Sequence, residues 1–172
     1  MSNFTEADIS RIPTKFGDIT LIMSSDLKPT ILAAGFGPAK QLANRLLATR
    51  DSIKLTNAHA PKGFLDIFVR WSDGDLTAFS GLRLDQVGSK FRQECWQEML
   101  RIPAGKTLSY SELAGKTSSV NAVRAAATAC ASNLIAPLIP CHRIIRSDGT
   151  LGKYGYGEKL KARLLEFEGV DL

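Results

Sequence analysis

The residues with the clearest chemical potential are Cys141 and His142, which are adjacent in the sequence. Cysteine reacts as its thiolate, and because a free thiol has a pKa of about 8.5, a base or a positive charge must act on it near pH 7. His142 can supply that base. Adjacent side chains of an extended chain point to opposite sides, so proton transfer requires a bent backbone or a bridging water. Pro140, directly before the cysteine, helps to fix such a backbone.

A histidine that acts as a base usually needs a carboxylate on its other ring nitrogen. Glu166 and Glu168, near the end of the sequence, are the candidates for this role. Two other interpretations stay open on these residues alone. Cys141 can be a small core residue beside a structural histidine, because free cysteines are among the most buried residues. It can also attack a carbonyl as in a thiol hydrolase, although the sequence offers no obvious further partner for that arrangement.

The sequence contains three cysteines and two histidines. Cys95 and Cys130 fall on apolar helical faces, so we predict that they are core residues. With an odd cysteine count, no C-x-x-C pair and only His59 besides His142, we predict neither a disulfide framework nor a metal site. Free thiols indicate a reducing compartment, so we expect the cytoplasm, or the nucleus in a eukaryotic cell.

The net charge of +5 is unevenly distributed. Residues 1–85 carry 10 Lys and Arg against 9 Asp and Glu, whereas residues 86–172 carry 12 against 8. A basic second half suggests a polyanionic partner such as nucleic acid, although a solvated surface also accounts for an excess of this size. There is no run of about 18 apolar residues and no secretory signal pattern, so we expect no membrane association.

The first half of the chain is predicted to contain strands and one helix. Two apolar runs around a turn that contains a proline predict a hairpin. Three leucines at helical spacing, Leu42, Leu46 and Leu47, predict the helix. The expected elements are hairpin strands over 17–23 and 31–34, a helix over 38–50, strands over 64–71 and 76–79, and a linker over 80–89.

The second half is predicted to be mostly helical. Ser89 can cap a helix that ends near Arg101, and Ser109 with Glu112 forms the S-x-x-E capping box of a second, short helix. A third helix follows over 120–132. A short helix, a turn and a second helix suggest a helix-turn-helix, although many helical hairpins look similar.

The third helix divides into two faces. Its small polar face, which includes Ala122, Ala125 and Thr128, can approach a nucleic-acid groove closely. The predicted buried residues are Val120, Val123, Ala127 and Cys130, and the predicted exposed residues are Asn121, Ala122, Arg124, Ala125 and Thr128.

The segments around the cysteine follow this helix. Residues 134–140 are apolar and are predicted to be a buried connecting chain. Residues 141–146 are predicted to be a short strand or an extended stretch. A loop with four glycines comes next, and a last helix over 158–168 is expected to end at Gly169.

A series of short motifs in residues 86–172 is more specific than any of these patterns. The motifs are Phe91-Arg92-Gln93-Glu94-Cys95-Trp96, Ile102-Pro103-Ala104-Gly105-Lys106-Thr107, Ser109-Tyr110-Ser111-Glu112-Leu113-Ala114, Ala122-Val123-Arg124-Ala125, Asn133, Ile139-Pro140-Cys141-His142-Arg143, Gly152-Lys153-Tyr154 and Glu168-Gly169. In order and approximate spacing they resemble the O6-alkylguanine-DNA alkyltransferases, also called methylated-DNA–protein-cysteine methyltransferases. Residues 1–85 match this family only loosely.

The resemblance implies a role for each residue around the cysteine. Cys141 matches the alkyl acceptor, His142 would deprotonate it through a water, and Glu168 would hold His142. Asn133 matches the hinge between the helix-turn-helix and the active-site strand. Tyr110 matches the tyrosine that presses on the phosphate and donates to guanine N3, which makes guanine a better leaving group.

The resemblance also implies a DNA- and substrate-binding set. Arg124 matches the residue that takes the place of the extruded nucleotide, on a helix that the family places in the minor groove. Tyr154 would stack on or close over the guanine. At Gly155 many relatives carry Ser or Arg, so a side-chain donor to O6 is missing, and either larger alkyl groups fit or affinity drops. The complete set is Arg124, Ala122, Ala125, Thr128, Arg143, Gly152, Tyr154 and Gly155.

For the whole chain, the resemblance implies an α+β protein with two domains. Residues 1–85 would form a small ribonuclease H-like sheet with a helix, and residues 86–172 a mostly helical, winged-helix-like domain with a helix-turn-helix. The implied activity is irreversible transfer of an alkyl group from O6 of guanine to Cys141, and transfer from O4 of thymine stays open. The protein would use double-stranded DNA with a flipped nucleotide, act once per molecule and need neither cofactor nor metal.

We expect a monomer, and cooperative assembly along DNA stays open. Two alternatives would use the same domain differently. A non-enzymatic lesion sensor carries another residue in place of the acceptor cysteine, which Cys141 argues against. A DNA-binding regulator would recognise an undamaged sequence, which the few polar groups of the third helix support poorly.

Overall fold

The structure, a computed structural model, describes residues 4–50 and 52–172 and consists of two compact units. The first unit holds the described residues up to Val87 together with Leu134–Ala136, and the second holds Gly88–Asn133 and Pro137–Leu172. The expected domain boundaries of 1–85 and 86–172 would place Leu134–Ala136 in the second domain, whereas in the structure this segment belongs to the first unit. Among the described residues, none of the helices combines the length and apolar character that a bilayer crossing needs.

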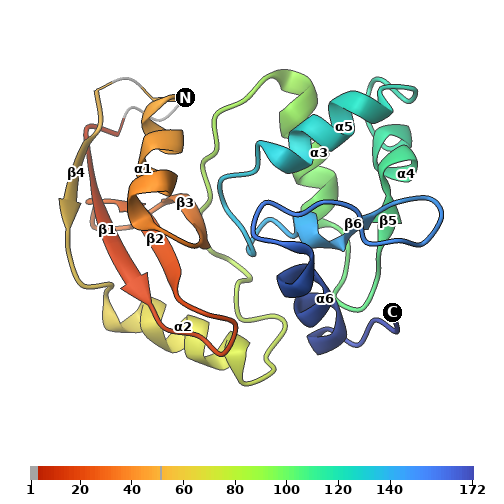
Figure 1. Cartoon of the computed structure of the whole chain (residues 1–172). Helices are drawn as coiled ribbons and strands as arrows, with labels where there is room; N and C mark the ends of the chain where they lie inside the picture. The colour runs from red at the N-terminus through yellow and green to blue at the C-terminus, as the bar shows by residue number, and fades with distance from the viewer. Residues whose placement is uncertain (1–3, 51) are drawn as a thin grey trace. The chain divides into compact units, whose positions relative to one another are not determined.

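The first unit is built on a four-stranded sheet in the order β3-β2-β1-β4 (Figure 1). β1 (Glu6–Ile12), β2 (Ile19–Ser24) and β3 (Ile31–Phe36) are successively antiparallel, whereas β4 (Lys54–Asn57) runs parallel to β1. The predicted hairpin is confirmed as β2 and β3, which are buried along their whole length. Sequence patterns missed β1 and β4, because polar residues interrupt β1 and β4 is mostly exposed.

The helix predicted from the leucine spacing is confirmed as α1 (Ala39–Leu47). It packs against β2 and β3 and buries Leu42 and Leu46. Leu47, on the other side of the helix, is exposed.

The strand predicted over 64–71 is wrong, because these residues belong to the helix α2 (Lys62–Ser72). A short apolar run fits either structure by periodicity alone. Phe68 and Trp71 lie one helical turn apart and are its buried residues, and both rings contact Phe79, at centroid distances of 5.1 and 5.2 Å. Phe79 therefore belongs to a turn that covers α2, and the strand predicted over 76–79 is also wrong.

Leu134–Ala136 continues the sheet at β3. Ala34 and Ile135 form a parallel bridge, in which the Ala34 amide donates to the Leu134 carbonyl at 2.8 Å and the Ala136 amide donates to the Ala34 carbonyl at 2.9 Å. Residues 134–140 are buried as predicted. The first three of them pair with β3 through an isolated β-bridge and are therefore not only a connection.

The second unit combines four helices with a two-stranded parallel sheet (Figure 1). The helices are α3 (Lys90–Leu100), α4 (Tyr110–Gly115), α5 (Val123–Ala131) and α6 (Glu158–Phe167), and the strands are β5 (Leu108–Ser109) and β6 (Ile144–Ile145). Ser89 caps α3 as predicted, and the capping box of α4 is present in full. The last helix was also predicted correctly to within one residue.

The third predicted helix is shorter than expected and its buried face is different. α5 begins at Val123 and not near Val120, and both valines are exposed. Ala126 and Ala129 are fully buried instead, and the Ala129 carbonyl accepts a hydrogen bond from the Trp96 indole at 2.9 Å. Alanines let α5 approach α3 closely, so the buried face follows side-chain size and not the most apolar residues.

The chain around the cysteine is bent. Cys141–Arg143 forms a 3-10 turn, so the extended stretch predicted over 141–146 is limited to β6. The Cys141 amide donates to the Ile139 carbonyl at 2.8 Å, and the Arg143 amide donates to the Pro140 carbonyl at 3.0 Å. This turn provides the bent backbone that a reactive cysteine–histidine pair requires.

Candidate active site

Cys141 lies in the second unit and is 7% exposed. Its sulfur accepts a hydrogen bond from Nδ2 of Asn133 at 3.1 Å, and the same nitrogen donates to the Ile139 carbonyl at 2.8 Å. Asn133 is buried directly after the C-cap of α5. It therefore connects the end of α5, the second helix of the helix-turn-helix formed by α4 and α5, to the sulfur, and a donor at this distance favours the thiolate.

His142 contacts Glu168 as expected, with 2.9 Å between Nε2 and Oε1. Both side chains are almost completely buried, whereas Glu166, the other candidate, is exposed. Burial alone would raise the pKa of Glu168, but its hydrogen bonds with His142 and Arg143 outweigh that effect and lower the pKa to about 2. Glu168 is therefore a carboxylate near neutral pH and accepts the Nε2 proton.

The neutral His142 ring then carries its lone pair on Nδ1. This atom is buried and has no hydrogen-bond partner among the described residues. Burial lowers the pKa of His142, and the contact with Glu168 only partly opposes this effect. The ring is thus neutral near pH 7 and can accept a proton at Nδ1.

Arg143 was expected to bind substrate or DNA, but its side chain is committed to a buried network. Its Nε donates to Oε2 of Glu168 at 2.8 Å, and one terminal nitrogen donates to Oε1 at 2.9 Å. The other terminal nitrogen donates to the Ile102 carbonyl. A bidentate arginine–carboxylate pair fixes both position and charge.

Sequence analysis missed Lys161, which is 1% exposed. Its ammonium donates to the carbonyls of Ile144 and Leu151, both at 2.5 Å, and so joins α6 to β6 and to the glycine loop. Burial lowers its pKa, and the thiol groups of Cys141 and Cys130 oppose that effect. The sequence did carry a signal for its burial. Lys161 lies three and four residues before Leu164 and Leu165, and therefore on the same, buried face of α6.

Tyr110, at the first position of α4, is part of the same neighbourhood. Burial and then the nearby thiols of Cys130 and Cys141 raise its pKa. Gly152 has a positive φ of 69°, and a Cβ there would lie 3.4 Å from the Tyr110 hydroxyl. The glycine loop therefore passes close to Tyr110.

Tyr154, in the same loop, contacts His142 edge-on at 6.5 Å between ring centroids. Its hydroxyl is buried without a hydrogen-bond partner among the described residues, and burial raises its pKa well above the usual value. A Cβ added at Gly155 would meet no atom of the described chain within 4 Å. The position that lacks a side-chain donor is therefore open.

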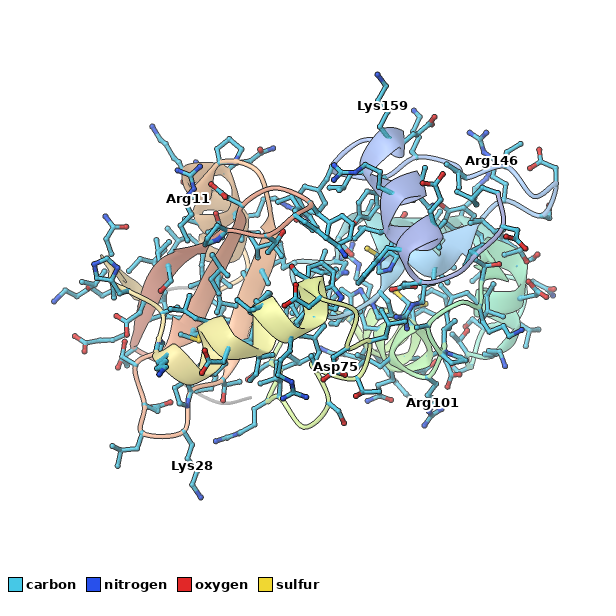
Figure 2. The ribbon with its side chains drawn as sticks, turned by 90° about the horizontal axis from the view of Figure 1, so that it is seen from below. Arg11, Lys28, Asp75, Arg101, Arg146 and Lys159 are labelled. Carbon is cyan, nitrogen blue, oxygen red and sulfur yellow. The ribbon has the colours of Figure 1, made fainter. Side chains whose placement is uncertain are left out.

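The residues expected to contact DNA share the exposed side of the helix-turn-helix. Arg124 is exposed. Ala122, Ala125 and Thr128 line an open hollow of about 410 Å³ that also includes Ser89 at the start of α3. Elsewhere on this unit, Figure 2 shows Arg146 and Lys159 projecting outward. The second unit therefore presents small side chains and cations to solvent.

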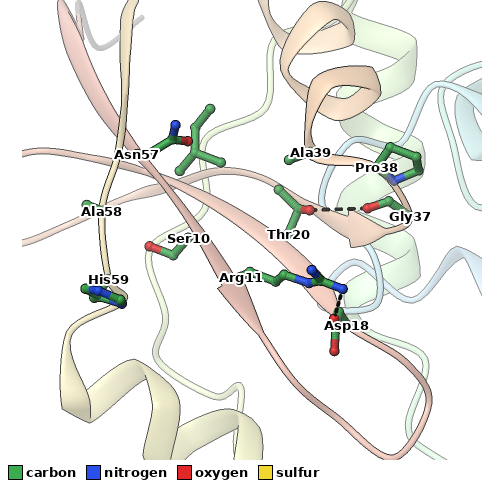
Figure 3. A pocket seen from close by; sticks show the side chains of 11 residues that line it. Ser10, Arg11, Asp18, Thr20, Gly37, Pro38, Ala39, Asn57, Ala58 and His59 are labelled. Atoms are coloured by element: carbon green, nitrogen blue, oxygen red, sulfur yellow. Dashed lines mark hydrogen bonds and ion pairs between the residues drawn. The ribbon is translucent and has the colours of Figure 1, made fainter.

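Of the other cysteines, Cys95 is buried, with a pKa raised to about 11 by burial, and the half-buried Cys130 lies in the neighbourhood of Cys141 and Tyr110. His59 borders a pocket of about 800 Å³ in the first unit, beside the Arg11–Asp18 ion pair (Figure 3). Within residues 4–50 and 52–172, no three His, Cys, Asp or Glu side chains cluster as a metal site would require.

Comparisons with known proteins agree with this geometry. The profile of the 6-O-methylguanine DNA methyltransferase DNA-binding domain matches residues 90–170. The crystal structure of Mycobacterium tuberculosis OGT in complex with DNA superposes with a TM-score of 0.76 and 30% identity, over 94% of this chain and 92% of that one. The chain belongs to the O6-methylguanine-DNA methyltransferase family. A Pyrococcus kodakaraensis family member, 21% identical with a TM-score of 0.71, shares the fold.

Curated relatives of this methyltransferase family match mainly the second unit. The bifunctional transcriptional activator/DNA repair enzyme Ada of Escherichia coli is 49% identical over 87 residues, which are 51% of this chain and 25% of Ada. The Mycobacterium leprae methylated-DNA–protein-cysteine methyltransferase is 44% identical over 95 residues, which are 55% of this chain and 57% of that protein. The matched part thus spans between a quarter and little more than half of these relatives.

Proposed function

We propose that this protein repairs DNA by moving an alkyl group from O6 of guanine to the sulfur of Cys141, once per molecule. The observation that carries this proposal is the buried chain of contacts from Asn133 to the sulfur, and from His142 to the Glu168 carboxylate, in the unit that also holds the helix-turn-helix. Family membership supplies the substrate class.

The residues divide the reaction between them. The thiol proton of Cys141 passes through a bridging water to Nδ1 of His142, whose Nε2 is held by Glu168. The thiolate attacks the alkyl carbon, and the carbon–oxygen bond to guanine breaks as the carbon–sulfur bond forms. Guanine takes up a proton as it leaves, with the Tyr110 hydroxyl as donor, and the imidazolium restores that proton. The alkyl group ends on sulfur, and the thiol proton ends on guanine.

The alkyl carbon is out of reach inside a duplex, so the nucleotide has to leave the base stack at a cost of about a few kcal/mol. Arg124 occupies the vacated place, and the small residues of α5 allow close approach to the minor groove. The exposure of Arg124 and the hollow beside Ala122 and Ala125 support this assignment. A thioether is stable in this setting, so the transfer is irreversible.

The finer fold assignments belong to the same proposal. An antiparallel β1–β2–β3 meander with β4 parallel to β1 supports a ribonuclease H-like first unit. The α4–α5 pair with the small β5–β6 sheet supports a winged-helix-like second unit. We also propose that the protein acts as a monomer on double-stranded DNA, in the cytoplasm or in a eukaryotic nucleus.

Intact-protein mass measurement with a duplex that contains O6-methylguanine tests this function. We expect a gain of one methyl group per molecule, on Cys141, and no further turnover when the duplex is in excess. Cys141→Ala should bind the duplex without gaining mass, while Cys130→Ala, the matched control, should still gain it. Methylation at another residue, or more than one lesion repaired per molecule, would contradict the proposal.

A further inference from the structure

Arg143 uses all of its side-chain nitrogens in the buried network. Two of them donate to the two carboxylate oxygens of Glu168, at 2.8 and 2.9 Å. The third donates to the backbone carbonyl of Ile102, just after the end of α3. The side chain is 13% exposed. Arg143 is therefore a fixed part of the site and cannot reach DNA without breaking these contacts.

Glu168 is shared between a base and a cation. Its Oε1 accepts from both His142 and Arg143, each at 2.9 Å, while Oε2 accepts from Arg143 alone. A buried carboxylate paired only with an imidazole strongly favours the imidazolium, because opposite charges attract most in a medium of low dielectric constant. The guanidinium opposes this bias because its positive charge partly offsets the charge of the carboxylate.

The other groups around His142 do not offset the negative charge of Glu168 in the way that Arg143 does. Burial is the main cause that lowers its pKa, the Glu168 contact raises it, and Arg143 followed by Lys161 lowers it again. The Tyr154 ring lies edge-on to the imidazole, and Cys141 precedes it in the turn. Among these, Arg143 is the cation that is hydrogen-bonded directly to the carboxylate.

We propose that Arg143 is a positioning residue that neutralises the Glu168 charge, so that the His142 ring stays uncharged in the resting protein and keeps Nδ1 open to accept the thiol proton. Without this guanidinium the carboxylate increases the proton affinity of His142, so that a larger fraction of the rings is protonated before substrate arrives and cannot act as the base. This role adds to the proposed function, and its effect on the rate of methyl transfer depends on that function. The protonation state of His142 can be measured without DNA.

Nuclear magnetic resonance of the two histidine rings provides the direct test. In the unmodified protein, the Cε1 signal of His142 should titrate at a lower pH than that of an ordinary histidine. In Arg143→Met, the proton affinity of His142 should increase at least tenfold. Arg143→Lys keeps the cation but loses the bidentate pair, so its affinity should lie between the two. Arg163→Met removes an exposed arginine of α6 and should leave the His142 signal unchanged.

The rate of methyl transfer gives a second readout. In Arg143→Met, the acid limb of the pH–rate profile should move to higher pH together with the His142 titration. An unchanged His142 titration in a folded Arg143→Met protein would overturn the proposal and leave alkyl transfer to Cys141 intact. A protein without methyl transfer to Cys141 at any pH would instead remove the proposed function. If Arg143→Met does not fold, Arg143→Gln, which keeps hydrogen-bond donors but removes the charge, decides, and an unchanged His142 titration in it overturns the proposal.

Discussion

Replacing Glu168 with glutamine removes the one charge that both His142 and Arg143 bind, and keeps the size of the side chain. The carboxylate oxygens are hydrogen-bonded to His142 at 2.9 Å and to Arg143 at 2.8 and 2.9 Å. Glutamine accepts hydrogen bonds only at its carbonyl oxygen. Its NH2 group is a donor and would lie against the N–H donors of Arg143 or His142. We therefore expect Glu168→Gln to destabilise the second unit and to slow methyl transfer.

The size of the loss follows from the pKa. Its change from the ordinary 4.5 to about 2 corresponds to about 3 kcal/mol of folding free energy at neutral pH, because one pKa unit is worth about 1.4 kcal/mol. A carboxyl with a lowered pKa stabilises the fold above its unfolded value, and this stabilisation is lost as the pH falls towards 2. The part of the difference that the Glu168 carboxyl contributes should thus shrink by about 1.4 kcal/mol between pH 7 and pH 3.5.

The lowered pKa of His142 adds its own pH dependence, with a known sign. An unfolded histidine binds a proton below its ordinary 6.5 and the buried ring resists it, so stability falls as the pH drops below that value. Glu168→Gln removes the contact that raises the pKa of His142, so this loss is larger in the variant and opposes the shrinkage below pH 6.5. The difference at pH 7, where the unfolded histidine is mostly uncharged, therefore reports mainly on Glu168.

Urea unfolding followed by Trp96 fluorescence measures this difference. Trp96 is buried in the second unit, and a Trp71→Phe background removes the signal of the first unit. Glu166→Gln, two residues earlier and exposed, is the matched control and should change stability by less than about 0.5 kcal/mol. A destabilisation below about 1 kcal/mol at pH 7 would refute the electrostatic reasoning.

Three further changes probe other parts of the site. Gly105→Ala should destabilise by about 1–3 kcal/mol in urea unfolding, because Gly105 has a φ of 77° and a Cβ there would lie 2.9 Å from the Glu168 carbonyl oxygen. Lys161→Met should change stability little, since it removes a buried charge along with two hydrogen bonds, but should slow methyl transfer roughly tenfold in single-turnover assays. Arg124→Ala should leave stability within about 0.5 kcal/mol, while titration with lesion DNA shows weaker binding and single-turnover assays show slower transfer.

Their controls lie close by in the chain. Gly115→Ala, where a Cβ meets no described atom within 4 Å, should not destabilise as Gly105→Ala does. Lys159→Met, on the exposed side of α6, should transfer methyl groups at the normal rate. An Arg124→Ala protein that binds and reacts as the parent does would remove the assigned role of this arginine.

The active site illustrates what the sequence could predict. The need of a histidine base for a carboxylate pointed to two glutamates, and the structure brings Glu168 to His142. The capping box fixed the start of α4, because two reciprocal side-chain bonds depend only on residues three apart. Local rules therefore located the helix that carries Tyr110 and the carboxylate partner of His142, but not the turn that carries Cys141.

Tertiary packing decided the parts that local rules missed. The apolar run of α2 fits a strand as well as a helix, and only the ring contacts of Phe68 and Trp71 distinguish them. In α5 the buried positions are alanines, because close approach to α3 selects small side chains over the valines. Leu134–Ala136 joins β3 about 100 residues away in sequence, which no local pattern can indicate.

Two charged residues, Arg143 and Lys161, were misplaced or overlooked by the sequence analysis for the same reason. Arg143 and Lys161 both belong to residue types that usually face solvent, so a sequence pattern assigns them to a surface. In the structure Arg143 is held by a carboxylate and Lys161 by two backbone carbonyls. Burying a cation is costly unless such partners compensate it, so each position constrains the segments that supply them. The basic character of the second unit therefore has two origins, a solvated surface that can meet DNA and a buried pair of cations beside Cys141 and His142.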